Sequence, residues 1–350
     1  MIEPVNQFEG RKRDHIALAL KEENEALGRA GFDTLDLLHE ALPDINFSEI
    51  NIECSILEMA QPAPFLISSM TAGHTDSTKI NSRLAVASSE KGWLMGVGSQ
   101  RRELFDATAR QEWLNVRKSA PKVKLLGNLG LSQVIQTSTD KIKELADSIE
   151  AVAMIIHLNP LQECLQTEGT PQFAGGLKRI SELVRDLQIP VVIKETGCGF
   201  SESTLNRLKE TGVAAVDVSG FGGTHWGRIE GQRSLSASMH SLAAAAFSDW
   251  GVTTVQSLLN AQNVNPNFEV WASGGVRSGV DAAKAIALGA NCVGFAKPLL
   301  QAALDGEGAL VDKMSAFEYE LKVSLFCTGC KNLSELKNKK VWAWRQKTTT

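Results

Sequence analysis

The stretch FEVWASGGVRSGVDAAKAIALGANCVGFAK (268–297) contains the unit from which we derive the fold. An apolar run ends in glycines, a segment with helical periodicity follows over 280–288, and a second apolar run ends in GFAK. Continuous apolar runs are typical of strands that are buried on both faces. The stretch therefore predicts a parallel strand, a covering helix and the next parallel strand.

The same alternation recurs along the chain. The apolar runs cover 64–69, 93–99, 122–128, 151–159, 190–197, 214–220, 268–275 and 291–297, and the clearest helical spacers cover 140–149, 176–187, 203–211 and 280–288. Eight such units over about 235 residues fit an α/β protein of the (β/α)8 TIM-barrel class, which is typically ~250 residues long. An open doubly wound sheet is the alternative, but no GxGxxG motif follows the first run.

Three regions are predicted. Residues 1–62 form an N-terminal extension with a helix from Arg13 to Ala26, 63–336 form the barrel, and 337–350 form a basic tail that we expect to be frayed. The alternative for the tail is packing of Trp342 and Trp344 on a neighbouring subunit. The interval 221–267, after the sixth strand, is unusually long, and predicts a binding loop followed by a helix over 239–262.

Composition excludes several classes of protein. With 36 basic and 40 acidic residues, the net charge of −4 argues against a general nucleic-acid binder. No apolar run approaches the ~18–20 residues that a membrane-spanning helix needs. Six scattered cysteines predict reduced thiols in a cytoplasmic enzyme, and the lone pair Cys327 and Cys330 is a weak indication of zinc. We expect a cytoplasmic protein.

Polar residues gather at the C-terminal ends of the predicted strands, where barrel enzymes carry their catalytic groups. The motifs SGGVRSG (273–279), GFAK (294–297) and GGT (222–224) predict a phosphate site, because glycines let backbone N–H groups approach the phosphate and a helix N-terminus adds partial positive charge. Ordinary glycine-rich turns are the alternative.

Two strand ends carry candidate catalytic groups. Lys194 lies in an apolar run, and a buried lysine needs an anionic or acceptor partner. It would contact the flavin ring in an FMN barrel; the alternative is a salt bridge to a neighbouring strand. His157 and Asn159 share a face of their strand and lead into Gln162, although a lone histidine is often a satisfied core residue.

Charged residues suggest how an anionic substrate is held. Glu163 follows a strand end and is a candidate Mg²⁺ ligand, since Mg²⁺ commonly takes one or two carboxylates and leaves the other positions to water and phosphate. RKRDH (11–15) is a compact basic cluster, for which a solvated helix start is the alternative.

Taken together, these motifs resemble the type 2 isopentenyl-diphosphate isomerases. RKRDHI, SMTAG, GSQR, HLNPLQE, VIKETG, DVSGFGGTHWGRIE and SGGVRSG occur in the order of that family, LFCTGCKNLSEL resembles its C-terminal helix, and the match runs from Arg11 to Leu336. Two departures are visible: Ala72 stands where the family usually has glycine, and His225 where serine is common.

The resemblance implies an FMN-binding barrel that requires Mg²⁺, receives electrons from NADPH, and interconverts isopentenyl diphosphate and dimethylallyl diphosphate in isoprenoid biosynthesis. Reduced FMN would be the acid/base catalyst. It also implies a homotetramer or homo-octamer that binds neither nucleic acid nor membrane. The N-terminal extension would carry the arm that binds the substrate diphosphate.

The resemblance also assigns roles to residues. Catalytic roles fall to His157, Gln162 and Lys194, and Glu163 would ligate Mg²⁺. Substrate would be bound by Arg11, Lys12, His15, Ser99, Gln100, Arg101, Asn159 and Gln162. FMN would be bound by Met70, Thr71, Ala72, Ser99, Asn128, Lys194, Ser219, Thr224, Gly275, Val276, Arg277, Ala296 and Lys297.

Three other functions are weighed against this one. A 2-hydroxy-acid oxidase would use a histidine after the sixth strand, where His225 lies, but also active-site tyrosines, and the chain has only Tyr319. An IMP-dehydrogenase-like enzyme would need a cysteine in 221–267, which has none. A flavin-binding module without catalysis would need neither Glu163 nor the basic N-terminus.

Overall fold

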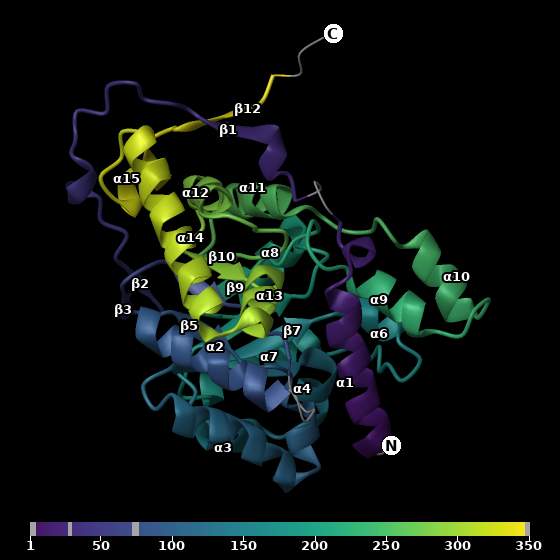
Figure 1. Cartoon of the computed structure of the whole chain (residues 1–350). Coiled ribbons are helices and arrows are strands. Elements are labelled where there is room, and N and C mark those ends of the chain that lie inside the picture. The colour runs from purple at the N-terminus through teal and green to yellow at the C-terminus, as the bar shows by residue number, and fades with distance from the viewer. Residues whose placement is uncertain (1–4, 27–29, 72–76, 347–350) are drawn as a thin grey trace.

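The computed structural model describes residues 5–26, 30–71 and 77–346, and its centre is a closed barrel of eight parallel strands (Figure 1). In order around the barrel the strands are β4 (Phe65–Ile67), β5 (Leu94–Gly96), β6 (Lys124–Gly130), β7 (Ala153–Leu158), β8 (Val191–Glu195), β9 (Ala215–Asp217), β10 (Glu269–Ala272) and β11 (Cys292–Phe295). The barrel closes where Val293 of β11 pairs with Phe65 of β4. The predicted (β/α)8 TIM barrel is confirmed, and each of its eight strands overlaps a predicted run.

Helices surround the barrel. They are α2 (Ser77–Lys91), α3 (Arg110–Ser119), α4 (Leu131–Gln136), α5 (Thr139–Ser148), α6 (Pro160–Leu165), α7 (Gly176–Asp186), α8 (Glu202–Lys209), α11 (Thr254–Val264), α12 (Gly279–Ala287), α13 (Lys297–Asp305), α14 (Glu307–Cys327) and α15 (Leu333–Asn338). The predicted helical spacers correspond to α5, α7, α8 and α12, each within one or two residues at its ends. N-capping side chains explain where some of these helices begin. Ser138 caps the N-terminus of α5, and Ser201 caps that of α8.

The interior of the barrel is filled from one end. Leu66, Leu126 and Trp271 point inward from three strands and pack with Ile56 and Leu57. The last two residues belong to the hairpin of β2 (Cys54–Ile56) and β3 (Met59–Gln61), which therefore closes the N-terminal end of the barrel. The C-terminal end remains for polar groups, as in other barrels of this class.

The N-terminal extension differs from the prediction. Its helix is α1 (Val5–Ala19), so the expected span from Arg13 to Ala26 is wrong at both ends. A short 3-10 helix, η1 (Glu22–Asn24), follows, and Glu25 then forms an isolated bridge with Thr224. Backbone pairing with a loop of the barrel ends the helical segment. We call residues 5–26 the arm.

The interval after β9 is more helical than predicted. The expected loop contains α9 (Trp226–Arg233), capped by His225, whose Nδ1 accepts from the N–H of Arg228. The expected helix over 239–262 is two helices, α10 (Met239–Ala246) and α11. The helix is interrupted between them, in the segment that contains Gly251, whose φ is +153°.

Part of the tail pairs with the N-terminal extension. Strand β12 (Trp342–Trp344) pairs antiparallel with β1 (Leu35–Leu37) in the same chain, so the expectation of a frayed end is wrong for residues 342–344. Packing of Trp342 and Trp344 on a neighbouring subunit stays a prediction. The division into extension, barrel and tail stays a prediction. The remaining short 3-10 helices are Phe32–Thr34, Phe47–Glu49, Gln100–Leu104 and Ala107–Ala109. Across the described ranges, no helix combines the length and apolar character needed to cross a membrane.

Candidate active site

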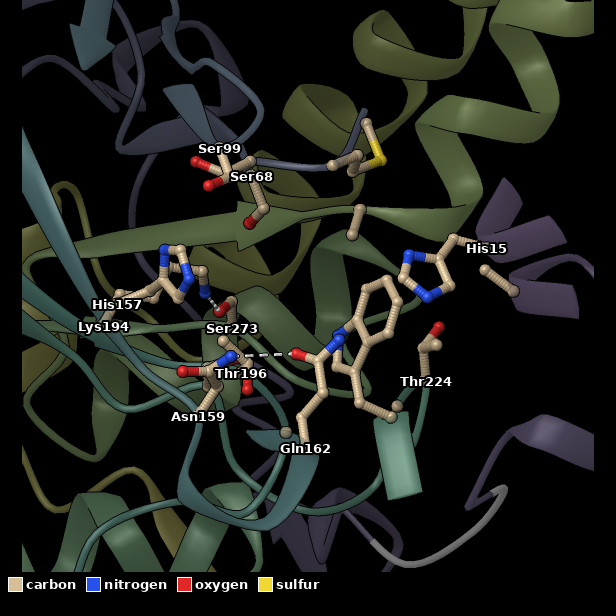
Figure 2. Close-up of a pocket in the computed structure, with 18 of the residues that line it drawn as sticks. His15, Ser68, Ser99, His157, Asn159, Gln162, Lys194, Thr196, Thr224 and Ser273 are labelled. Atoms are coloured by element: carbon tan, nitrogen blue, oxygen red, sulfur yellow. Dashed lines mark hydrogen bonds between the residues drawn. The ribbon is translucent and has the colours of Figure 1, made fainter. Parts of the chain in front are cut away.

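A cavity opens at the C-terminal end of the barrel, and the arm contributes one of its walls (Figure 2). Most of the predicted site residues line it: Arg11, Lys12, His15, Met70, Thr71, Ser99, Arg101, Asn128, His157, Asn159, Gln162, Glu163, Lys194, Ser219, Thr224, Gly275, Val276, Arg277, Ala296 and Lys297. In the view of Figure 2, His157 and Lys194 lie to the left and His15 and Thr224 to the right.

Two predicted site residues are not placed in this cavity. Gln100 is fully buried beneath the rim, where its carbonyl accepts from the N–H of Asn128 (3.1 Å) and its amide donates to Glu103 (3.2 Å). The hydrogen bonds of this side chain are therefore used within the fold, and the assignment of Gln100 to substrate binding stays a prediction. Ala72 lies outside the described residues.

Lys194 is held by an anion on the adjacent strand. Its Nζ lies 2.7 Å from Asp217 Oδ2 and donates to Ser273 Oγ at 2.9 Å (Figure 2). Lys194 and Asp217 are register partners on β8 and β9, and the two side chains are 7% and 1% exposed. The predicted alternative, a salt bridge between neighbouring strands, is thus present. It does not displace Lys194 from the cavity, which the lysine still lines.

His157 is neutral and has a defined tautomer. The Asn128 amide nitrogen donates to the carbonyl of Val97 (3.0 Å), which turns its oxygen toward His157 Nδ1 at 2.8 Å. An amide oxygen only accepts, so Nδ1 carries the proton and Nε2 is the acceptor. Burial lowers the pKa of His157 to about 3, and the nearby cations Lys12 and Lys194 act in the same direction.

A chain of amide contacts orients Gln162. Its side-chain oxygen accepts from Asn159 Nδ2 (3.2 Å, Figure 2), and its Nε2 donates to Glu230 Oε1 (3.0 Å). Asn159 Nδ2 also donates to Glu163 (3.1 Å), whose other carboxylate oxygen accepts from the N–H of Thr170 (2.6 Å). Gln162 and Glu163 are consequently fixed by one network that begins at the end of β7.

The arm is attached to the site through Glu230 of α9. Glu230 Oε1 lies 3.0 Å from His15 Nε2, and Glu230 Oε2 accepts from Arg233 at 2.5 Å. Burial raises the pKa of Glu230, but contact with His15 and the charge of Arg233 outweigh it and bring the value to about 2. Burial also lowers the pKa of His15. Glu230 therefore stays ionised and links α1 to α9, which lie side by side (Figure 1).

Basic side chains of the arm and the rim face the same space as Glu163. Arg11, Lys12 and Arg101 line the cavity together with this carboxylate. Within the described residues, no cluster of three or more histidine, cysteine or acidic side chains is arranged for a metal ion. One carboxylate beside three cations suits a Mg²⁺ ion that takes most of its other ligands from a polyphosphate and water.

The glycine-rich motifs form closely packed loops, which we call the glycine loops: Gly222–Thr224 and Gly274–Arg277. A Cβ on Gly223 would lie 2.7 Å from the backbone nitrogen of Gly275, and Gly275 has φ +77°. The N-terminus of α12 has fewer free N–H groups for a phosphate than expected. The N–H of Arg277 donates to Asp281 (3.0 Å), and that of Gly279 donates to Glu320 (2.5 Å). The loop backbone, Arg277 and Lys297 remain to bind an anion.

The cavity floor fits a flavin ring system. Among the described residues, the buried hydroxyls of Ser68 and Ser69 have no hydrogen-bond partner. A Cβ on Gly294 would lie 2.5 Å from Ser68 Oγ, so glycine there keeps the hydroxyl clear. Unpartnered hydroxyls and the ammonium of Lys194 around one cavity, together with the glycine loops, match a planar heterocycle that carries a phosphate.

The structure gives roles to four residues to which the sequence motifs assigned none. Asp217 and Ser273 hold Lys194, Glu230 holds His15 and Gln162, and Glu25 of the arm reaches the glycine loops. For Asp217 a signal exists in the sequence: KETG and DVSG place Lys194 and Asp217 at the same distance from a glycine. Glu230 lies 215 residues from His15, and no local pattern connects them.

Comparisons with known proteins agree with this geometry. Residues 157–343 match the family model described as FMN-dependent dehydrogenase. Two relatives are named isopentenyl-diphosphate delta-isomerase. The one from Bdellovibrio bacteriovorus is 52% identical over 345 residues, covering 97% of this chain and 99% of its own. The one from Legionella pneumophila strain Corby is 53% identical over 334 residues, covering 95% and 98%.

Solved structures share the fold at low sequence identity. A flavocytochrome b2 variant with bound sulfite superposes with a TM-score of 0.67 at 17% identity, covering 97% of this chain and 84% of its own. A lactate oxidase from Pediococcus acidilactici gives 0.65 at 16% identity, covering 97% and 94%. At these identities the likeness concerns the barrel alone.

Proposed function

This chain belongs to the isopentenyl-diphosphate delta-isomerase family, in the type built on an FMN-dependent dehydrogenase barrel, and we propose that it interconverts isopentenyl and dimethylallyl diphosphate with reduced FMN and Mg²⁺. One observation carries the proposal. A single cavity joins a buried lysine and glycine loops, which suit a flavin, to one carboxylate and a group of basic side chains, which suit a metal-bound diphosphate.

Amino-acid side chains alone are poor catalysts for this isomerisation. Moving an unactivated double bond requires protonation of one carbon and deprotonation of another, with a cation-like state between them. Ordinary side-chain acids are too weak for the first step. When bound, reduced FMN would supply a ring nitrogen for acid/base work and an electron-rich face against the alkene.

Residues at the rim would hold the flavin. We assign Met70, Thr71, Ser99, Asn128, Lys194 and Ser219 to its ring and ribityl chain, and Thr224, Gly275, Val276, Arg277, Ala296 and Lys297 to its phosphate end. Lys194 would place a positive charge at the ring, where it would stabilise added negative charge. Asp217 keeps that ammonium in position.

His157 and Gln162 orient and shape the alkene end of the site. A neutral His157 with Nε2 unprotonated adds no positive charge beside a cation-like state. Gln162 presents an amide whose two ends are held by Asn159 and Glu230. These two hydrogen bonds fix the position of the Gln162 side chain, which carries no charge.

The diphosphate provides most of the binding energy for a small apolar substrate. Arg11, Lys12 and His15 of the arm, with Ser99, Arg101 and Asn159 of the rim, surround the space beside Glu163. Glu163 would ligate Mg²⁺, which would neutralise the diphosphate and fix its position. We further propose a cytoplasmic enzyme that uses NADPH as reductant and assembles as a homotetramer or homo-octamer.

The hydroxy-acid oxidase alternative does not fit the side chains. His225, the candidate base, is 1% exposed, caps α9 and lies 3.2 Å from the carbonyl of Trp250 rather than among the cavity-lining residues. Tyr319 lies exposed on α14.

The experiment is a reconstitution. Protein stripped of flavin is assayed anaerobically with isopentenyl diphosphate and Mg²⁺, then again after FMN and NADPH are added. We expect dimethylallyl diphosphate only after reconstitution and reduction. A full rate in the flavin-free protein would contradict the proposed role of FMN, and no product with reduced flavin bound would contradict the isomerase function.

A further inference from the structure

The proposed flavin-phosphate end already contains an anion from the arm. Glu25 lies directly after η1, and its carboxylate forms ion pairs with Arg277 Nη2 (2.5 Å) and Lys297 Nζ. Both cations line the cavity beside the glycine loops. The Glu25 side chain is only 5% exposed, so water and salt screen these pairs weakly.

The backbone holds Glu25 in this place independently of its charge. The N–H of Ala26 donates to the carbonyl of Gly223 (2.9 Å), and Glu25 itself bridges to Thr224. The carbonyl of Glu25 accepts from Arg228 Nη1 at 2.7 Å. Because the main chain is anchored on the glycine loops, a neutral side chain of the same shape should leave the arm in position.

The charges oppose the binding of a phosphate. Arg277 and Lys297 together carry two positive charges, and Glu25 cancels one of them. A phosphate monoester carries roughly −1.5 to −2 charges near neutral pH and would share these cations with the carboxylate. A phosphate and the Glu25 carboxylate, both bound to the same two cations at short range, repel each other. This repulsion is large enough to lower the affinity of the site for the phosphate measurably.

We propose that Glu25 is a specificity-determining residue that lowers the affinity of the site for phosphorylated flavin and leaves the affinity for riboflavin unchanged. The proposal rests on the FMN site proposed above. It makes the arm more than a substrate-binding element. The segment that carries Arg11, Lys12 and His15 ends in a carboxylate that competes with the flavin phosphate for Arg277 and Lys297.

The test is a pair of binding titrations. Flavin-free wild-type protein and the Glu25→Gln variant are titrated with FMN and with riboflavin, and flavin fluorescence is followed. We expect the dissociation constant for FMN to fall about tenfold in the variant, while that for riboflavin stays the same. Glu22→Gln is the matched control, because Glu22 lies in the same segment and is exposed. It should change neither constant.

The outcomes separate the two proposals. Equal changes for both flavins, or weaker binding of FMN by Glu25→Gln, would overturn the inference, since Glu25 would then support Arg277 and Lys297 rather than oppose the phosphate. Wild-type protein that binds neither flavin would contradict the proposed function itself, and the inference with it. If Glu25→Gln does not fold, Glu25→Ser removes the same charge with a smaller side chain and faces the same criteria.

Discussion

The strand ends of the barrel and the N-terminal arm hold their polar groups in different ways. At the rim, Lys194 and Asp217 are register partners on adjacent strands, and the barrel backbone sets their distance. In the arm, His15 reaches its place through Glu230, a side chain from a helix far along the sequence. The rim is therefore positioned by the barrel backbone, while the part of the arm that carries His15 is positioned by side-chain contacts. We expect substitutions at the rim to affect stability and flavin binding, and substitutions where the arm meets α9, around His15 and Glu230, to affect substrate binding.

The largest effect is expected at the rim, for Lys194→Met. The substitution leaves Asp217 buried with its charge uncompensated, which should cost roughly 3–5 kcal/mol in the free energy of unfolding. Urea unfolding of the flavin-free protein measures it. The double variant Lys194→Met, Asp217→Leu should recover most of the loss. A single variant as stable as the wild type would contradict the view that the barrel fixes this pair.

A smaller but still large effect is expected where rim and arm meet, for Glu163→Gln. Loss of the carboxylate that would ligate Mg²⁺ should lower turnover at least about a hundredfold, or about 2.7 kcal/mol. The dependence of the rate on Mg²⁺ concentration should shift upward as well. Glu182→Gln, on the outer helix α7, serves as control. An unchanged Mg²⁺ dependence would remove Glu163 from the metal site.

His157 should make the stability of the rim depend on pH. Its folded pKa of about 3 is below the ordinary 6.5, so the unfolded chain binds the proton more tightly. The stabilising contribution is complete above pH 6.5 and is lost as the pH falls from 6.5 toward 3, by at most about 1.4 kcal/mol per pH unit. Unfolding of His157→Gln should show a shallower slope in this window. Parallel slopes for the two proteins would show that His157 is not buried in its neutral form.

The smallest of these effects is expected where α9 contacts the arm, for Glu230→Gln. The variant loses the charge that faces His15 and Arg233, while the strands of the barrel are untouched. We expect KM for isopentenyl diphosphate to rise about fivefold, which corresponds to ~1 kcal/mol, and the dissociation constant for FMN to stay the same. Steady-state kinetics and flavin titration measure the two quantities. A variant that loses FMN affinity instead would erase the distinction between arm and rim.

The same contrast explains what the sequence can predict. Apolar runs separated by helical spacers are a local pattern, so all eight strands and the rim positions of Lys194, His157 and Glu163 follow from it. The resemblance assigns Gln100 to the site through the GSQR motif, but its side chain turns inward to satisfy buried groups of β6 and α5. The arm's partners could not be found locally, since Glu25 and Glu230 meet Arg277 and His15 only after the barrel has closed.

The most direct test of the account is a proton-transfer experiment in heavy water. Isopentenyl diphosphate, Mg²⁺ and the FMN-loaded protein are incubated anaerobically with and without NADPH, and proton NMR follows product and deuterium. We expect dimethylallyl diphosphate that carries solvent deuterium, formed only when the flavin is reduced. No product with the reduced flavin bound, or the same product from the flavin-free protein, would contradict it.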